Sequence, residues 1–196
     1  MRKPYAGKKD FIVGTLVNRR RKKQTNSCSR FSCKTYKQMT EFNENAEKTL
    51  REELVELLKG GFAPNVILLR EFNYKKAGIV LDGLHFSAWV LLGHIRARHK
   101  TLLDFMKNPD SDKDLWPDAH WPENHTPQSE QEWNREIDKY EQELQEMLEL
   151  VQNPQTPLLK KQPNGRTISW AALTTLHHTG YHIGQLKTIG RQLGVW

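Results

Sequence analysis

The chain has 196 residues, of which 37% are hydrophobic and 27% are charged, a composition that excludes collagen-like, wholly disordered and coiled-coil-only proteins. Its apolar runs are far shorter than the roughly 20 residues needed to span a bilayer, so we expect a soluble, cytoplasmic protein with no membrane partner. The formal net charge is +7, but this charge is unevenly distributed along the sequence.

The basic excess belongs to the first 38 residues. Residues 1–38 contain twelve Lys and Arg against the single acid Asp10, whereas residues 39–196 have a net charge of −4. We therefore predict two parts: a basic extension over 1–38, disordered or artefactual and without helical periodicity, and one folded domain over 39–196. Because the folded domain is mildly acidic, we do not expect it to bind nucleic acid.

Three interpretations of the extension are compatible with its composition. It can be an artefact of the start codon, with Met39 as the true first residue of the domain. It can be a functional basic arm for nucleic acid or an anionic surface, or an organellar targeting peptide. Both cysteines, Cys28 and Cys33, lie in it, so the domain has no disulfide framework, as is usual in a reducing compartment.

The apolar periodicity of the domain predicts helices and no strand. The second predicted helix is apolar on nearly all sides, which is typical of a central helix, and the third is strongly amphipathic. We therefore expect an all-α, four-helix bundle, with one or two helical turns in the connector over 62–82. The predicted helices cover residues 44–59, 86–106, 129–151 and 169–193.

The loop between the second and third helices carries two Trp-Pro pairs, Trp116-Pro117 and Trp121-Pro122. A long loop without secondary structure of its own needs a reason to exist. We expect its tryptophans to pack on the domain, as a lid that excludes water from a cavity at the end of the bundle.

The histidines are the candidate chemical groups. His178 and His182 lie one helical turn apart on the same face, whereas His177 points about 100° away. His94 lies in the central helix, in an apolar context where an imidazole needs a partner. Three neutral imidazoles with an open position are typical of a catalytic metal site. The same spacing also occurs in structural packing, and residues 150–196 contain no Asp or Glu to serve as a general base.

Several motifs together resemble one known family. From about residue 54 to the C-terminus the chain resembles the DinB/YfiT-like superfamily of metal-dependent bundle proteins. The resemblance implies a DinB-type four-helix bundle in which His94, His178 and His182 hold a divalent ion such as zinc or nickel. The basic extension departs from the family pattern. The matching stretches are His85-Phe86-Ser87-Ala88-Trp89, Leu92-Gly93-His94-Ile95-Arg96, Trp116-Pro117, Trp121-Pro122-Glu123 and His178-Thr179-Gly180-Tyr181-His182-Ile183-Gly184-Gln185-Leu186.

The superfamily includes transferases and isomerases that use low-molecular-weight thiols. The resemblance therefore implies a metal-dependent enzyme with a small-molecule substrate, either a thiol-dependent S-transferase or a metal-hydroxide hydrolase. Tyr181 and Gln185 are candidates to orient a ligand, although both are equally typical of a bundle core. The alternative is a non-catalytic bundle that binds metal or serves as a stress-related interaction module. Trp196 is a candidate either for packing on the bundle or for a homodimer interface.

Overall fold

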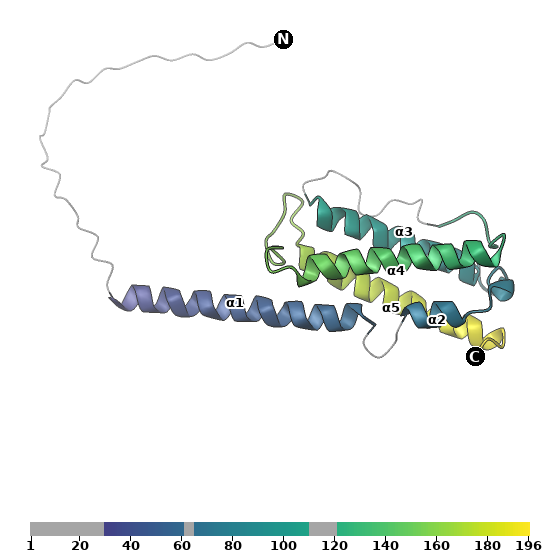
Figure 1. Cartoon of the computed structure of the whole chain (residues 1–196), viewed down its shortest axis with the longest axis horizontal. Helices are drawn as coiled ribbons and strands as arrows, with labels where there is room; N and C mark the ends of the chain where they lie inside the picture. The colour runs from purple at the N-terminus through teal and green to yellow at the C-terminus, as the bar shows by residue number, and fades with distance from the viewer. Residues whose placement is uncertain (1–29, 61–64, 110–120) are drawn as a thin grey trace, which may run out of the picture. The chain divides into compact units, whose positions relative to one another are not determined.

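A computed structural model of the protein describes residues 30–60, 65–109 and 121–196 (Figure 1). Within these ranges the chain forms five α-helices, one 3-10 helix and no strand, so the predicted all-α class is confirmed. The arrangement is compatible with a helical bundle. No helix in these ranges is long and apolar enough to cross a membrane. The elements are α1 (Arg30–Leu58), α2 (Asn65–Glu71), η1 (Tyr74–Lys76), α3 (Ala88–Lys107), α4 (Glu130–Gln152) and α5 (Ile168–Gln192).

Helix α1 begins at Arg30 rather than at the expected Glu44. The prediction that the extension lacks helical structure is therefore wrong for residues 30–38. Residues 15–59 contain no Gly or Pro, so nothing in the sequence stops this helix from continuing upstream. Periodicity missed it because the side chains of residues 35–46 are exposed and leave no apolar stripe to detect.

The chain divides into two compact units, Met1–Gln38 and Met39–Trp196. The division falls at the residue where the charge of the sequence changes. Residues 1–29 lie outside the described residues, Cys28 among them, as does the side chain of Cys33. All that follows concerns the second unit.

Helix α3 packs against both α4 and α5, and the three helices lie alongside one another in Figure 1. Each begins at a hydroxyl side chain that accepts a hydrogen bond from a backbone N–H of the first turn. Ser87 caps α3, Ser129 caps α4 and Thr167 caps α5. These three helices start within two residues of the positions predicted from periodicity. Helices α2 and η1 are the helical turns that the sequence predicted in the connector.

The buried apolar side chains form two clusters rather than one. The first apolar cluster joins the C-terminal half of α3 to the N-terminal half of α5, with Leu54 and Leu58 of α1. The second joins the N-terminal half of α3 to the C-terminal half of α5 and includes Leu69 of α2. Along α3 and α5 the two clusters are separated by a polar layer. This layer consists of Arg98, His99, Thr175 and Thr179, all buried.

Arg51 ties α1 to the end of α4. Its guanidinium donates hydrogen bonds to the backbone carbonyls of Val151, Asn153 (2.8 Å) and Thr156 (3.0 Å). The last carbonyls of a helix have no partner within the helix and carry its negative dipole end. The guanidinium of Arg51 therefore supplies hydrogen-bond donors to these carbonyls and a positive charge to the negative end of the helix dipole. It also fixes α1 beside the first apolar cluster.

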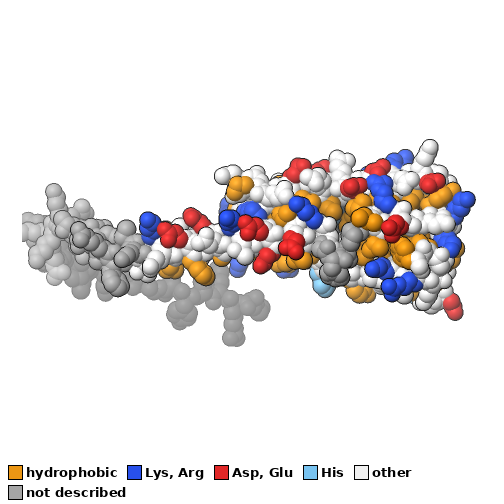
Figure 2. All heavy atoms as spheres, turned by 60° about the horizontal axis from the view of Figure 1, so that its bottom comes forward, with side chains coloured by type: hydrophobic (Ala, Val, Ile, Leu, Met, Phe, Trp, Pro, Cys, Tyr) orange, Lys and Arg blue, Asp and Glu red, His pale blue; other side chains and the backbone are white. Residues whose placement is uncertain are grey.

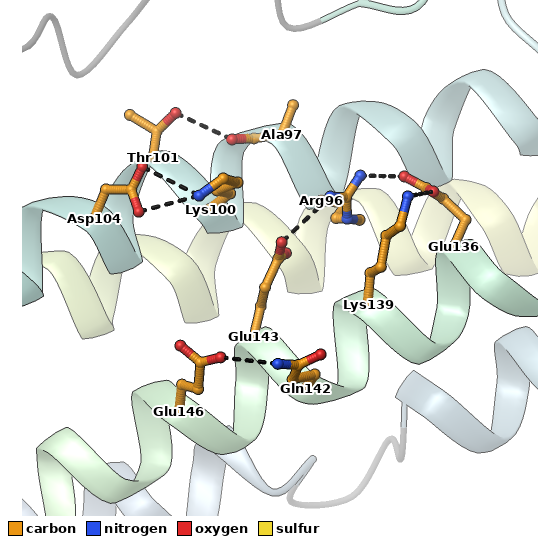
Figure 3. A network of polar contacts seen from close by, with 10 residues as sticks. All are labelled: Arg96, Ala97, Lys100, Thr101, Asp104, Glu136, Lys139, Gln142, Glu143 and Glu146. Carbon is orange, nitrogen blue, oxygen red and sulfur yellow. Dashed lines mark hydrogen bonds and ion pairs between the residues drawn. The ribbon is translucent and has the colours of Figure 1, made fainter.

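Helices α3 and α4 are also joined by a charged network that centres on Arg96 (Figure 3). Arg96 pairs with Glu136 and with Glu143, the latter at 3.4 Å, and Glu136 also accepts a hydrogen bond from Lys139. Partial burial raises the pKa of Glu143, an effect that the positive charge of Arg96 opposes. The network sets the register between the two helices on the side of α3 away from α5.

Trp196 packs on its own chain. Its ring meets Phe72 edge-on, with the ring centroids 5.7 Å apart, and it lies against Gly190. Of the two roles predicted for this residue, the structure shows the packing on the bundle.

The buried His99 predicts how stability depends on pH. Burial against the ring of Tyr140 lowers the pKa of His99 to about 4. An unfolded histidine titrates near pH 6.5, so between about pH 6.5 and pH 4 the unfolded chain binds more protons than the folded one. The stability held by neutral His99 is therefore present above about pH 6.5 and is lost as the pH falls through this window, by roughly 3 kcal/mol.

Urea unfolding of wild type and of His99→Phe at several pH values measures this effect. The variant is expected to lose most of the pH dependence between pH 6.5 and 4. It should also be no less stable at neutral pH, because neither ring nitrogen of His99 has a hydrogen-bond partner among the described residues. The matched control is His177→Phe, at an exposed histidine of α5. An unchanged pH slope in His99→Phe would contradict the assignment.

Candidate metal centre

The packing of α3 against α5 brings three imidazoles together. His94 comes from α3, and His178 and His182 come from consecutive turns of α5. One ring nitrogen from each lies within 4.8 Å of the others, and the Nε2 atoms of His94 and His178 are 3.1 Å apart. The predicted convergence of these three residues is confirmed. His177 is exposed and does not belong to the group.

The centre lies at the border of the second apolar cluster. His94 and His182 are buried, and His178 is half-buried, so the group is reached from one side only. Burial lowers the pKa of His182, an effect that its hydrogen bond to Gln185 partly opposes. Burial thus favours the neutral imidazole, which is the form that ligates a metal ion.

Gln185 fixes the orientation of His182. The Nδ1–H group of His182 donates a hydrogen bond of 2.7 Å to Oε1 of Gln185. The Gln185 amide in turn donates to the hydroxyl of Tyr181, at 3.4 Å. With the proton held on Nδ1, the Nε2 lone pair of His182 is available as a ligand. Tyr181 is 62% exposed, so it is not the core residue that its helical position equally allowed.

Trp121 covers the centre. Its indole stacks on the ring of His94, with centroids 3.7 Å apart and planes 11° apart, and it meets His182 edge-on at 6.1 Å. On its other side it contacts Phe86, at 5.6 Å between centroids. The prediction that the tryptophans of this loop pack on the domain is therefore confirmed for Trp121, and the place of its packing, over His94, is a finding of the structure. Trp116 and Pro117 lie outside the described residues, as does His120.

Gly93 makes room for this arrangement. A Cβ atom at Gly93 would lie 2.5 Å from Cγ of Pro122, so the proline ring occupies the space where a side chain would be. The neighbouring residues Trp121 and His94 stack beside this contact. Sequence reasoning missed the role of Gly93, although a glycine directly before a candidate ligand was a signal of close backbone approach.

The other histidines outside the group serve elsewhere or face solvent. The backbone carbonyl of His125 accepts a hydrogen bond of 2.6 Å from the hydroxyl of Ser87, the residue that caps α3. This bond fastens the end of the Trp-Pro loop to the start of the helix that carries His94. His85 is exposed in the connector before α3.

Comparisons of the chain with protein-family models, with curated proteins and with solved structures find no match.

The contact between Gly93 and Pro122 predicts opposite effects for two glycine substitutions. Gly93→Ala is expected to lower the free energy of unfolding by about 1–3 kcal/mol, because the new methyl group overlaps the proline ring. Gly180→Ala is expected to raise it by up to about 1 kcal/mol, because a Cβ there meets nothing within 4 Å and alanine favours the helix.

Chemical denaturation of both variants beside wild type measures the difference. Equal effects of the two substitutions would show that the Trp-Pro loop does not pack on α3 at Gly93.

Proposed function

We propose that the chain is a divalent-metal-dependent enzyme of the DinB/YfiT-like type, in which His94, His178 and His182 hold the ion and a low-molecular-weight thiol is the nucleophile. The observation that carries this proposal is the convergence of three imidazole nitrogens at one partly buried point. Three neutral imidazole nitrogens that converge on one point are a donor set that suits a divalent transition-metal ion.

The geometry fits such an ion. In a tetrahedral zinc site with metal–nitrogen distances of about 2.0–2.1 Å, two ligand nitrogens are about 3.3 Å apart. The Nε2 atoms of His94 and His178 are 3.1 Å apart, close to this value, and all three ligand nitrogens lie within 4.8 Å of one another, so metal binding would draw the rings together. The hydrogen bond between His182 and Gln185 supplies the outer support that orients metal-binding histidines. Three imidazoles suit both zinc and nickel.

A divalent ion on three neutral ligands keeps its charge and an open position, and it acidifies a thiol or water that binds there. The residues around this position favour a thiol. Helix α5 contains no Asp or Glu, so it supplies no general base of the kind that hydrolysis uses. A thiol needs such a base less than water does, because the free pKa of a thiol, about 8.5, is far below the roughly 15.7 of water. Tyr181 and Gln185 offer neutral hydrogen-bonding groups that can orient the second substrate.

The proposed reaction is S-transfer to an electrophilic carbon. The sulfur forms a bond to carbon, the leaving group departs with the bonding electron pair, and the thiol proton passes to solvent. Trp121 covers His94 and restricts access of water to the nucleophile.

Binding of nucleic acid has no comparable support in the described part of the chain. On the face shown in Figure 2, basic and acidic side chains are interspersed over the bundle.

Metal content is the first test. The full chain, purified without a polyhistidine tag and supplied with zinc or nickel, is expected to hold about one equivalent of metal. His94→Ala and His182→Ala should lose it, and Gln185→Leu should weaken it by about tenfold or more, because the second imidazole nitrogen loses its support. His177→Ala is the matched control and should keep the metal. Elemental analysis and chelator competition measure these values, and a wild-type chain that takes up neither ion would overturn the proposal.

Turnover is the second test. The metal-loaded chain is expected to accelerate the reaction of a small thiol such as cysteamine or glutathione with an aryl halide such as 1-chloro-2,4-dinitrobenzene, with release of chloride. His94→Ala should lower the rate by about 100-fold or more, since nucleophile activation is lost. Thiol-independent hydrolysis of an aryl ester would favour the hydrolase instead. Metal binding without either activity would favour the non-catalytic bundle.

A further inference from the structure

A groove of about 370 Å³ lies beside the metal centre, between connector residues 81–86 and the exposed face of α5. Tyr181 and Gln185 line the groove, and both also contact His182, at the centre. On the opposite wall, Phe86 contacts Trp121, which stacks on His94. Both walls of the groove thus contact residues of the centre, so the groove lies one layer of side chains away from the imidazoles.

The lining of the groove has a definite chemical character. Leu81, Leu84 and Phe86 supply an apolar wall, and Thr188 and Gln192 add uncharged polar groups farther along α5. This combination suits a ligand with an apolar chain and room for hydrogen bonds along it. The groove follows α5 from Tyr181 to Gln192, about 16 Å at the rise of an α-helix, so an extended small molecule fits along it.

The residues that line the groove carry a single negative charge. Asp82 is the only charged residue among those that line it, and its carboxylate makes no ion pair with any described residue. Lys187 and Arg191 are the cations of this half of α5. They follow Gly184 by three and seven residues, so they border the groove on its Gly184 edge, whereas Asp82 belongs to the connector wall. A ligand tail that ends beside Asp82 would meet a carboxylate, which would attract a cationic tail and repel an anionic one.

We propose that this groove binds the tail of the thiol that acts at the centre, and that it selects a thiol with an apolar chain ending in an ammonium group. The inference rests on the function proposed above, since the sulfur is to lie at the metal. The apolar wall contacts the hydrocarbon part of the thiol, and Asp82 pairs with its ammonium group. Gln185 belongs to both parts of the site, because it lines the groove and hydrogen-bonds His182.

The test uses the full chain loaded with cobalt(II), because binding of a thiolate to cobalt gives a charge-transfer absorption band that reports occupancy without turnover. The probes are 6-amino-1-hexanethiol and 6-mercaptohexanoic acid, which each have six carbons and carry opposite charges at the end of the tail. At low ionic strength the amine is expected to bind about fivefold more tightly than the acid, a preference that decreases with added salt.

Two variants separate the charge of the groove from its shape. Asp82→Asn should reduce the preference for the amine toward equality, whereas Asp138→Asn, at an exposed aspartate of α4, should leave it unchanged. Gly184→Leu should fill the groove, since a Cβ at Gly184 meets nothing within 4 Å. This variant should weaken both six-carbon thiols while leaving the affinity for 2-mercaptoethanol, which is too short to occupy the groove, as it is.

The outcomes distinguish this proposal from the one on which it rests. If cobalt binds and the thiols give the band, but the two tails bind equally and neither Asp82→Asn nor Gly184→Leu changes their affinities, the groove proposal is overturned and the metal centre stands. If the chain takes up no cobalt, both proposals are overturned together.

Discussion

Burial of α3 between α4 and α5 is the constraint on which the rest of the structure depends. A helix in this position carries its polar side chains into the interior, where each one needs a partner from a neighbouring element. Arg96 finds Glu136 and Glu143 on α4, and Ser87 finds a carbonyl of the Trp-Pro loop. His94 finds His178 on α5 and the indole of Trp121. The candidate centre is thus one of several solutions to the same requirement, and it differs from the others because it gathers three imidazoles, which lie close enough together to bind a metal ion.

The centre also depends on elements that carry no ligand. The contact of Pro122 with Gly93 places Trp121 over His94, and the hydrogen bond from Ser87 to the carbonyl of His125 holds the following part of the loop at the start of α3. Gln185 holds His182 from the opposite side. The three imidazoles are therefore supported by a loop, a helix cap and a neighbouring side chain of α5, which together leave little freedom to the rings.

Much of the fold could be predicted from the sequence because helices of a bundle bury one face and show it as apolar periodicity. The same signal placed α3, α4 and α5 within two residues of their ends, and it failed for the part of α1 before Glu44, where the side chains of residues 35–43 are exposed. The three histidines could be predicted because His94 is polar in an otherwise apolar stretch and because His178 and His182 share a face. The stacking of Trp121, the place of Pro122 on Gly93 and the groove beside α5 could not be predicted, because each depends on how a loop returns to a helix that is distant in sequence.

The interior is divided into two apolar clusters, and the three imidazoles lie beside only one of them. Opening of one end of the bundle therefore affects the centre differently from opening of the other end. Leu54 and Leu58 attach α1 to the first apolar cluster, whereas the residues flanking the three imidazoles, such as Leu91, Ile95 and Ile183, belong to the second. Sub-global opening follows units of contiguous packing, and the polar layer interrupts that packing. Detachment of α1 therefore exposes the first cluster to solvent exchange while the histidine end of the bundle stays closed, so order can be lost at one end while the imidazoles at the other keep their arrangement.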